Sequence, residues 1–161
     1  MNHKKTLFLT QAAVIAALYT VLVIVFQSFS FGPVQFRIAE ALTILPYFTP
    51  AAIPGVTIGC FLSAILSGSD LLDIVFGPLA TLIAAILSYL LRRYKFLVPI
   101  PPIVVNAFVI PWVLRFAYGK VQPIWLMTLT VGGGQILACG ILGLGLLFSL
   151  EKVRHVVFKN D

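Results

Sequence analysis

The stretch Phe36-Arg37-Ile38-Ala39-Glu40-Ala41-Leu42 carries two opposite charges in a chain that is otherwise strongly apolar. Arg37 and Glu40 are three residues apart, so a helix would place them on one face. Charged side chains within a membrane segment are costly, and they usually face a cavity, a partner or a substrate. The same stretch opens a short apolar segment, and the length of this segment decides how many times the chain can cross a membrane.

The composition is that of an integral membrane protein. Of the 161 residues, 60% are hydrophobic and 10% are charged, and the mean hydropathy is +1.07. A soluble domain has about 25% charged residues. The net charge of +6 does not indicate nucleic-acid binding, because the basic residues flank the apolar segments and form no stripe interleaved with aromatic residues. We therefore expect the lipid bilayer, and no nucleic acid, as a partner.

Six apolar segments are candidates for membrane-spanning helices, each of which needs about 20 residues. They cover residues 7–27, 37–48, 53–66, 73–91, 99–117 and 121–150. The second is short and is bounded by Pro46 and Pro50, so the second and third segments could instead form one broken hairpin and give five spans. The first segment is too long for the core of a cleaved signal peptide, and we expect it to be retained as a helix.

The basic residues favour six spans over five. Six spans put both termini on one side, and that side then holds three basic clusters, as the cytoplasmic bias of Lys and Arg expects. The clusters are Lys4 and Lys5; Arg92, Arg93 and Lys95; and Lys152, Arg154 and Lys159. The sequence thus predicts an all-α integral membrane protein with six transmembrane helices and cytoplasmic N- and C-termini, in which residues 1–161 form a single transmembrane domain.

This topology places most intramembrane polar residues in the outer leaflet, which suits a pocket open to the outside. Each of them also has a structural alternative. Arg37 and Arg115 could reach the headgroups as anchors, and Trp112 could belong to an interfacial aromatic belt. Asp70 and Asp73 could cap the N-terminus of a helix.

Glu40 is the polar residue for which a purely structural role is least satisfactory. It lies one turn deeper than Arg37 and cannot reach the headgroups, whereas Arg37 could snorkel or orient Glu40, and Asn106 could hydrogen-bond between helices. The loop of residues 28–36 is a candidate lid. The expected substrate-binding residues are Gln35, Arg37, Glu40, Asp73, Asn106, Trp112 and Arg115.

Small residues four apart on the first span would allow another helix to approach it closely. Two such pairs are present, Ala12 with Ala16 and Ala13 with Ala17. Either pair could pack against a helix of the same chain or dock on a partner membrane protein. Spacing alone does not decide which pair serves which purpose.

Common catalytic and nucleotide-binding motifs are absent from the sequence. There is no G-x-x-x-x-G-K-[ST] loop for ATP, no H-E-x-x-H and no G-x-S-x-G. Asp70 and Asp73 alone make a weak set of metal ligands, because no His or Cys accompanies them. Cys60 and Cys139 lie in apolar sequence and are expected to pack as small buried hydrophobes. We expect no enzymatic activity, metal or cofactor in this chain.

Four stretches combine polar residues with apolar sequence in a recognisable pattern. They are Phe31-Gly32-Pro33-Val34-Gln35-Phe36-Arg37-Ile38-Ala39-Glu40-Ala41-Leu42, Ala52-Ile53-Pro54-Gly55, Ile58-Gly59-Cys60 and Asp73-Ile74-Val75-Phe76-Gly77-Pro78-Leu79-Ala80-Thr81-Leu82. Together they resemble the substrate-binding (S) components of energy-coupling factor (ECF) transporters, and among these the QueT queuosine-precursor transporters. The alanine pairs of the first span are similar to the A-x-x-x-A contact of S components with a shared transmembrane scaffold subunit.

The resemblance implies a six-helix subunit in a bacterial cell membrane that captures 7-aminomethyl-7-deazaguanine, or a related 7-deazapurine, from outside. It also implies two partner ATPase subunits, which use ATP and magnesium. Glu40 could then accept two N–H groups of the guanine-like edge, Asp73 could balance the aminomethyl cation, and Trp112 could stack on the rings. The alternatives are an S component for another vitamin or nucleobase, a membrane scaffold or pore without a captured ligand, and an intramembrane enzyme.

Overall fold

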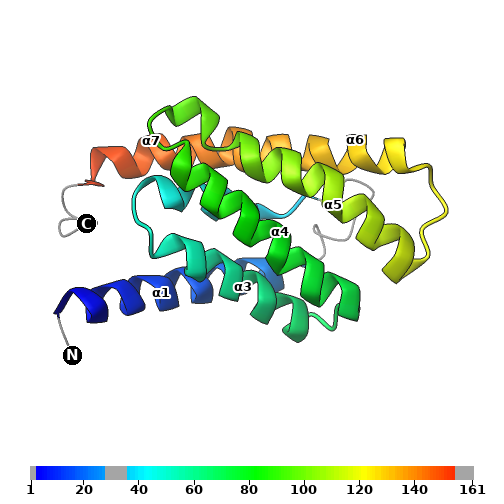
Figure 1. The fold of residues 1–161 in the computed structure, drawn as a ribbon, viewed down its shortest axis with the longest axis horizontal. Coiled ribbons are helices and arrows are strands. Elements are labelled where there is room, and N and C mark those ends of the chain that lie inside the picture. The colour runs from blue at the N-terminus through cyan, green and yellow to red at the C-terminus, as the bar shows by residue number, and fades with distance from the viewer. Residues whose placement is uncertain (1–2, 28–35, 155–161) are drawn as a thin grey trace.

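The computed structural model describes residues 3–27 and 36–154, and over these ranges the regular secondary structure is entirely helical (Figure 1). The predicted all-α fold is thereby confirmed for the described residues. Segment 28–35 of the candidate lid, which includes Gln35, lies outside them, as does Lys159 of the third basic cluster. The elements are α1 (His3–Val25), the 3₁₀ helix η1 (Ile38–Tyr47), α3 (Ala52–Leu66), α4 (Leu71–Leu90), the short 3₁₀ helix η2 (Lys95–Leu97), α5 (Ile100–Tyr118), α6 (Ile124–Gln135), the π-helix η3 (Ile136–Gly143) and α7 (Leu144–Lys152).

Among the described residues, 4 helices are apolar and long enough to cross a membrane. They are His3–Val25, Leu71–Leu90, Lys95–Tyr118 and Ile124–Lys152. The second and third predicted segments are shorter, since η1 has 10 residues and α3 has 15. At rises of about 2.0 and 1.5 Å per residue, each of these two helices is roughly 20 Å long, against about 30 Å for a hydrocarbon core. Six full spans therefore stay a prediction.

The 3₁₀ helix η1 lies in the interior of the fold. All its residues from Ala39 to Pro46 are buried, and it contacts α1, α3, α4, η3 and α7. Runs of 3₁₀ helix longer than 3–4 residues are uncommon, and packing by the surrounding helices stabilises this one. The backbone of Arg37 is extended (φ −104°, ψ 104°), so η1 begins only after it.

Close packing joins α1 to α3 through small residues. A Cβ atom at Gly55 would lie 2.9 Å from Ile15 Cβ, and one at Gly59 would lie 2.7 Å from Tyr19 Cβ. Thr20 donates a hydrogen bond of 3.2 Å to the Gly59 carbonyl. Only glycine allows two helix backbones to approach this closely. The contact holds Tyr19 in the interior, where its hydroxyl enters the site described below.

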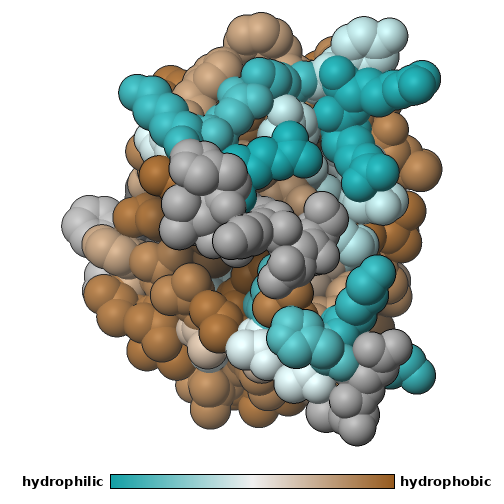
Figure 2. Space-filling model, turned by 90° about the vertical axis from the view of Figure 1, so that its left-hand side faces the viewer, coloured by the Kyte–Doolittle hydropathy of each residue, from teal (hydrophilic) through white to brown (hydrophobic). Residues whose placement is uncertain are grey.

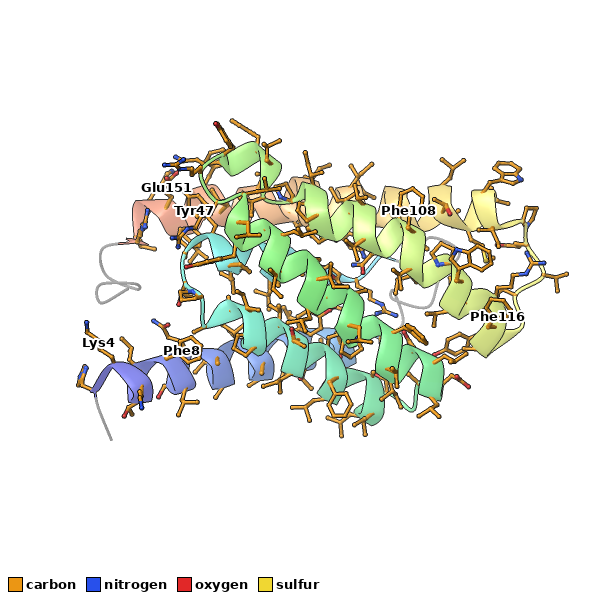
Figure 3. All side chains as sticks on the ribbon, viewed as in Figure 1. Lys4, Phe8, Tyr47, Phe108, Phe116 and Glu151 are labelled. Carbon is orange, nitrogen blue, oxygen red and sulfur yellow. The ribbon has the colours of Figure 1, made fainter. Side chains whose placement is uncertain are left out.

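The beginning of α1 and the end of α7 lie at the same end of the molecule, on the left in Figure 1. Lys4, Tyr47 and Glu151 mark this end in Figure 3, whereas Phe116 marks the other. Glu151 Oε1 lies 2.5 Å from Lys95 Nζ and accepts a hydrogen bond of 3.3 Å from the Tyr47 hydroxyl. Figure 2, which looks onto this end, shows hydrophilic side chains over its upper and right-hand parts. The described residues of the three predicted basic clusters therefore share one end of the structure.

Candidate functional site

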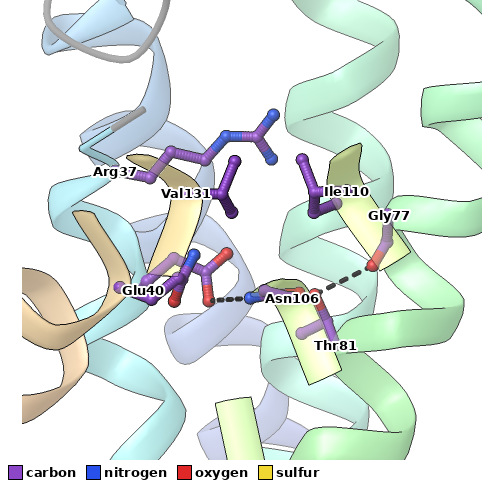
Figure 4. Close-up of a pocket in the computed structure, with 8 residues that line it drawn as sticks. Arg37, Glu40, Gly77, Thr81, Asn106, Ile110 and Val131 are labelled. Carbon is purple, nitrogen blue, oxygen red and sulfur yellow. Dashed lines mark hydrogen bonds between the residues drawn. The ribbon is translucent and has the colours of Figure 1, made fainter. Parts of the chain in front are cut away.

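A polar cavity lies between the helices in the middle of the fold (Figure 4). Four segments meet there: η1 with the residue before it, α4, α5 and α6. Each of the three α-helices contributes two lining residues four positions apart, as expected for side chains on one helix face. The lining residues are Arg37, Glu40, Gly77, Thr81, Asn106, Ile110, Val131 and Gln135.

Glu40 is buried in the wall of this cavity, with 2% of its surface exposed. The Tyr19 hydroxyl donates a hydrogen bond of 2.7 Å to Glu40 Oε1, and the Asn106 amide nitrogen donates a longer one of 3.4 Å to Oε2. Within the described ranges, the ion pairs join other residues and none involves this carboxylate. A carboxylate buried among neutral partners is costly, and its oxygens can accept further hydrogen bonds.

Arg37 pairs with Asp73 instead of orienting Glu40. The distance from Arg37 Nη2 to Asp73 Oδ2 is 3.7 Å, and both side chains are largely buried. The predicted geometry, in which a helix carries Arg37 and Glu40 on one face, does not form. Because the backbone at Arg37 is extended and precedes η1, its side chain does not follow the helical spacing and turns to α4.

Asp73 is shared between two partners, since the Tyr118 hydroxyl also donates a hydrogen bond of 3.2 Å to its Oδ2. The same hydroxyl accepts a hydrogen bond of 3.2 Å from the Asp70 backbone N–H. Asp70 caps α4, because its Oδ1 accepts from the Leu72 N–H at 2.9 Å. In the described part of the chain, no three His, Cys, Asp or Glu side chains are placed to hold a metal ion.

The cavity is closed in this structure. Its volume is about 10 Å³, and a single water needs about 10–15 Å³ on the same scale. Ile110 and Val131 lie between Arg37 and the Glu40–Asn106 pair in Figure 4. A two-ring heterocycle could enter only after these lining side chains separate, so the structure shows a form in which the polar groups hydrogen-bond to one another.

Two buried residues around the cavity, Tyr19 and Gln135, were not predicted from the sequence. The hydrogen bonding of Cys139 was not predicted either. Cys139 is buried as expected, but its thiol donates a hydrogen bond of 3.1 Å to Gln135 Oε1 and lies 3.4 Å from the Glu40 carbonyl oxygen. Tyr19 and Gln135 are hydrogen-bonding residues in the middle of apolar helices. This position is the signal that could have identified them.

Trp112 and Arg115 do not line the cavity at which they were expected. Trp112 is 49% exposed and stacks on Phe116, with ring centroids 6.0 Å apart, and Arg115 is also exposed. An α-helix turns by about 100° per residue, so Arg115, nine positions after Asn106, points about half a turn away from it. Both residues lie at a suitable depth along α5, but they point away from the helix face that carries Asn106 and lines the cavity.

The two alanine pairs of α1 lie on different faces. Ala12 and Ala16 are buried, and their backbone carbonyls lie against the α3 glycines. Ala13 and Ala17 are exposed. Of the four residues predicted to dock on a partner, Ala12 and Ala16 therefore pack within the chain, and Ala13 and Ala17 remain at its surface.

Comparison with known proteins extends over nearly all of this fold. The profile of the QueT transporter family matches residues 9–152. A relative from Lactococcus lactis subsp. cremoris, named queuosine precursor transporter QueT, is 38% identical over 98 residues, an alignment that covers 59% of this chain and 57% of the relative. No solved structure matches the chain. Because the family match includes the helices that carry the cavity, the chain belongs to the QueT transporter family.

Proposed function

We propose that this chain is the substrate-binding subunit of an ECF-type transporter and captures a queuosine precursor at Glu40. The ligand would be 7-aminomethyl-7-deazaguanine or a related 7-deazapurine. The observation that carries the proposal is a buried carboxylate whose hydrogen-bond donors, Tyr19 and Asn106, are both neutral, in a polar cavity. Membership of the QueT transporter family, and the name of the Lactococcus relative, support the substrate class.

The donors and acceptors of the cavity suit a guanine-like base. The pairing edge of such a base presents two adjacent N–H donors, and a carboxylate can accept both in a charge-assisted pair. Glu40 Oε2 has spare capacity, because its contact with Asn106 is long. Ile110 and Val131 line the same cavity and can cover the faces of a flat ring, in place of the stacking expected from Trp112.

Asp73 is the candidate partner for a ligand ammonium group. Its distance of 3.7 Å from Arg37 exceeds the about 2.7–2.9 Å of a direct charged hydrogen bond. An aminomethyl cation could take the place of Arg37 on Asp73 while Tyr118 continues to donate to the same carboxylate. Entry of the ligand would then release Arg37 from Asp73 and, at the same time, widen the closed cavity.

The remaining parts of the transporter would lie on other chains. A transmembrane scaffold subunit would contact Ala13 and Ala17, which are small and exposed on α1. Two ATPase subunits would use ATP and magnesium, and this chain would need no cofactor and catalyse no reaction. In a bacterial cell membrane crossed six times, the basic end would face the cytoplasm and the Asp73 end the outside.

Calorimetric titration of the purified protein with 7-aminomethyl-7-deazaguanine tests this proposal. Glu40→Gln should weaken binding by about 1.5–3 kcal/mol, roughly 10- to 150-fold, because it removes a charged acceptor from a dry site. Glu151→Gln is the matched control, since Glu151 is a carboxylate paired with Lys95 at the basic end. Equal affinities of Glu40→Gln and the wild type would refute the assignment of Glu40.

A second candidate keeps the fold and changes the cargo to another nucleobase or vitamin. The carboxylate of Glu40 and the amides of Asn106 and Gln135 offer hydrogen bonds that other flat heterocycles could use. Mass spectrometry of small molecules released from the protein purified from cells separates the two. A 7-deazapurine supports the first candidate, and any other stoichiometric compound supports the second.

A further inference from the structure

The last long helix changes its winding at the cavity. It is α-helical over Ile124–Gln135 and π-helical over Ile136–Gly143. Segments of π-helix are rare and occur frequently at functional sites. This segment packs on η1, and its Cys139 Sγ lies 3.4 Å from the Glu40 carbonyl oxygen. The change in winding therefore occurs where the last helix meets the segment that carries Glu40.

The side chain of Gln135 is held through its oxygen. It is 4% exposed and lines the cavity. The Cys139 thiol donates to Gln135 Oε1 at 3.1 Å, and Cys139 Sγ also lies 3.5 Å from Thr43 Oγ1. Because the amide oxygen accepts from Cys139, the amide nitrogen remains available to the cavity. This nitrogen carries two N–H donors.

The other polar side chains that line the closed cavity already take part in contacts with the protein. Arg37 is in an ion pair, and Thr81 donates a hydrogen bond of 3.1 Å to the backbone of its own helix. Asn106 donates to Glu40, and the Glu40 carboxylate can only accept. Gln135 can therefore donate to a ligand acceptor without giving up a contact of the closed cavity.

We propose that Gln135 is a specificity-determining residue whose amide nitrogen donates a hydrogen bond to the carbonyl oxygen of a guanine-like base bound at Glu40. This inference rests on the proposed function and deepens it. The pairing edge of a guanine-like base carries a carbonyl oxygen next to its N–H donors. Glu40 would accept from the N–H donors and Gln135 would donate to the carbonyl oxygen. A base without that acceptor leaves the Gln135 nitrogen unpaired in a closed site, and unpaired buried groups are a strong basis for discrimination.

Two probes separate this role from general binding. The first is 7-aminomethyl-7-deazaguanine, and the second is its 6-thio counterpart, which keeps both N–H donors and replaces the carbonyl oxygen by a weakly accepting sulfur. Calorimetry should show that the wild type prefers the oxo compound by about tenfold. Gln135→Met, which has a similar length and no N–H donor, should lose about tenfold for the oxo compound and little for the thio compound, so the preference disappears.

The variants around Gln135 distinguish positioning from structure. Cys139→Ser keeps a donor to Gln135 Oε1 and should keep the preference, whereas Cys139→Ala should reduce it. Glu40→Gln should weaken both compounds and leave their ratio unchanged. Gln135→Leu is measured beside Gln135→Met, so that the ratio is obtained from whichever variant folds.

The outcomes separate the two proposals. If the wild type binds neither compound, the proposed function fails and this inference fails with it. If the wild type binds the oxo compound but the Gln135 variants lose both compounds equally, or lose neither, this inference alone is overturned.

Discussion

Glu40 and Asp73 are both carboxylates inside an apolar protein, but their surroundings differ. Asp73 has a cation and a hydroxyl beside it, from Arg37 and Tyr118. Among the described residues, the hydrogen bonds to the Glu40 carboxylate come from a hydroxyl and an amide, and Arg37 lines the same cavity without an ion pair to it. Removal of a carboxylate from water is not compensated by neutral partners alone, so a ligand explains Glu40 better than stability does. At the scale of residues, the proposed function therefore assigns the neutral donors of a base to Glu40 and a cation to Asp73.

Tyr19→Phe should lower the stability of the protein. The Tyr19 hydroxyl is fully buried and donates at 2.7 Å to Glu40. Its removal leaves a charged acceptor with one long contact, which should cost about 1.5–3 kcal/mol in the free energy of unfolding. Thermal unfolding in detergent measures this, with Tyr89→Phe as the control because the Tyr89 ring lies under Arg92. Equal melting temperatures for the two variants would show that the hydroxyl does not stabilise Glu40.

Asp73→Asn should weaken an aminomethyl ligand more than the corresponding nitrile. The variant removes the charge that would pair with the ammonium group, at a cost of about 1.5–3 kcal/mol, whereas the uncharged nitrile does not depend on it. Competition binding with the two compounds measures the difference. Asp70→Asn is the control, because Asp70 caps α4. Equal losses for both ligands would remove the cation-binding role of Asp73.

At the scale of elements, the two faces of α1 have different surroundings. Its inner face packs on α3 and carries the Tyr19 hydroxyl to Glu40. Its outer face presents Ala13 and Ala17. Because α1 packs tightly on α3, we expect a partner docked on the outer face to act on both helices.

Gly59→Ala should destabilise the protein. The added Cβ would lie 2.7 Å from Tyr19 Cβ and 2.9 Å from the Ala16 carbonyl oxygen, and such overpacking costs about 1–3 kcal/mol. Gly133→Ala is the matched control. A Cβ there meets nothing within 4 Å, and alanine is favoured over glycine in a helix by up to about 1 kcal/mol. Thermal unfolding should therefore shift in opposite directions, and parallel shifts would contradict the tight α1–α3 contact.

At the scale of the whole molecule, the polar groups divide into three regions. Basic residues gather at one end, and Glu40 lies in the closed cavity between the helices. Arg37, Asp73 and Tyr118 form a connected group near the start of α4, which reaches the cavity through Arg37. The described residues of the predicted basic clusters lie together, and Glu40 is buried as the sequence predicts, whereas the opening of its pocket to the outside stays a prediction. The sequence could predict both because charge is costly in lipid wherever it lies on a helix.

Ala17→Trp should prevent assembly with a scaffold subunit while ligand affinity is retained. A large side chain on the small-residue face would keep a second helix from approaching closely. Co-purification with the partner subunits measures assembly, and titration with the base measures binding. Leu90→Trp is the control, since Leu90 is exposed on α4. Undiminished co-purification of Ala17→Trp would exclude this face as the docking surface.

The sequence by itself determined the membrane class, the helical segments, the clustering of basic residues and the choice of Glu40 as the candidate binding residue, because these follow from hydropathy and charge along the chain. Only the tertiary structure decided which side chains meet. Tyr19 reaches Glu40 across 21 positions and Asn106 reaches it across 66, whereas Trp112 and Arg115 turn away. Hydropathy gives the depth of a residue along a helix. The rotation of each helix about its axis is set by packing against its neighbours, and that rotation decides which residues form the site.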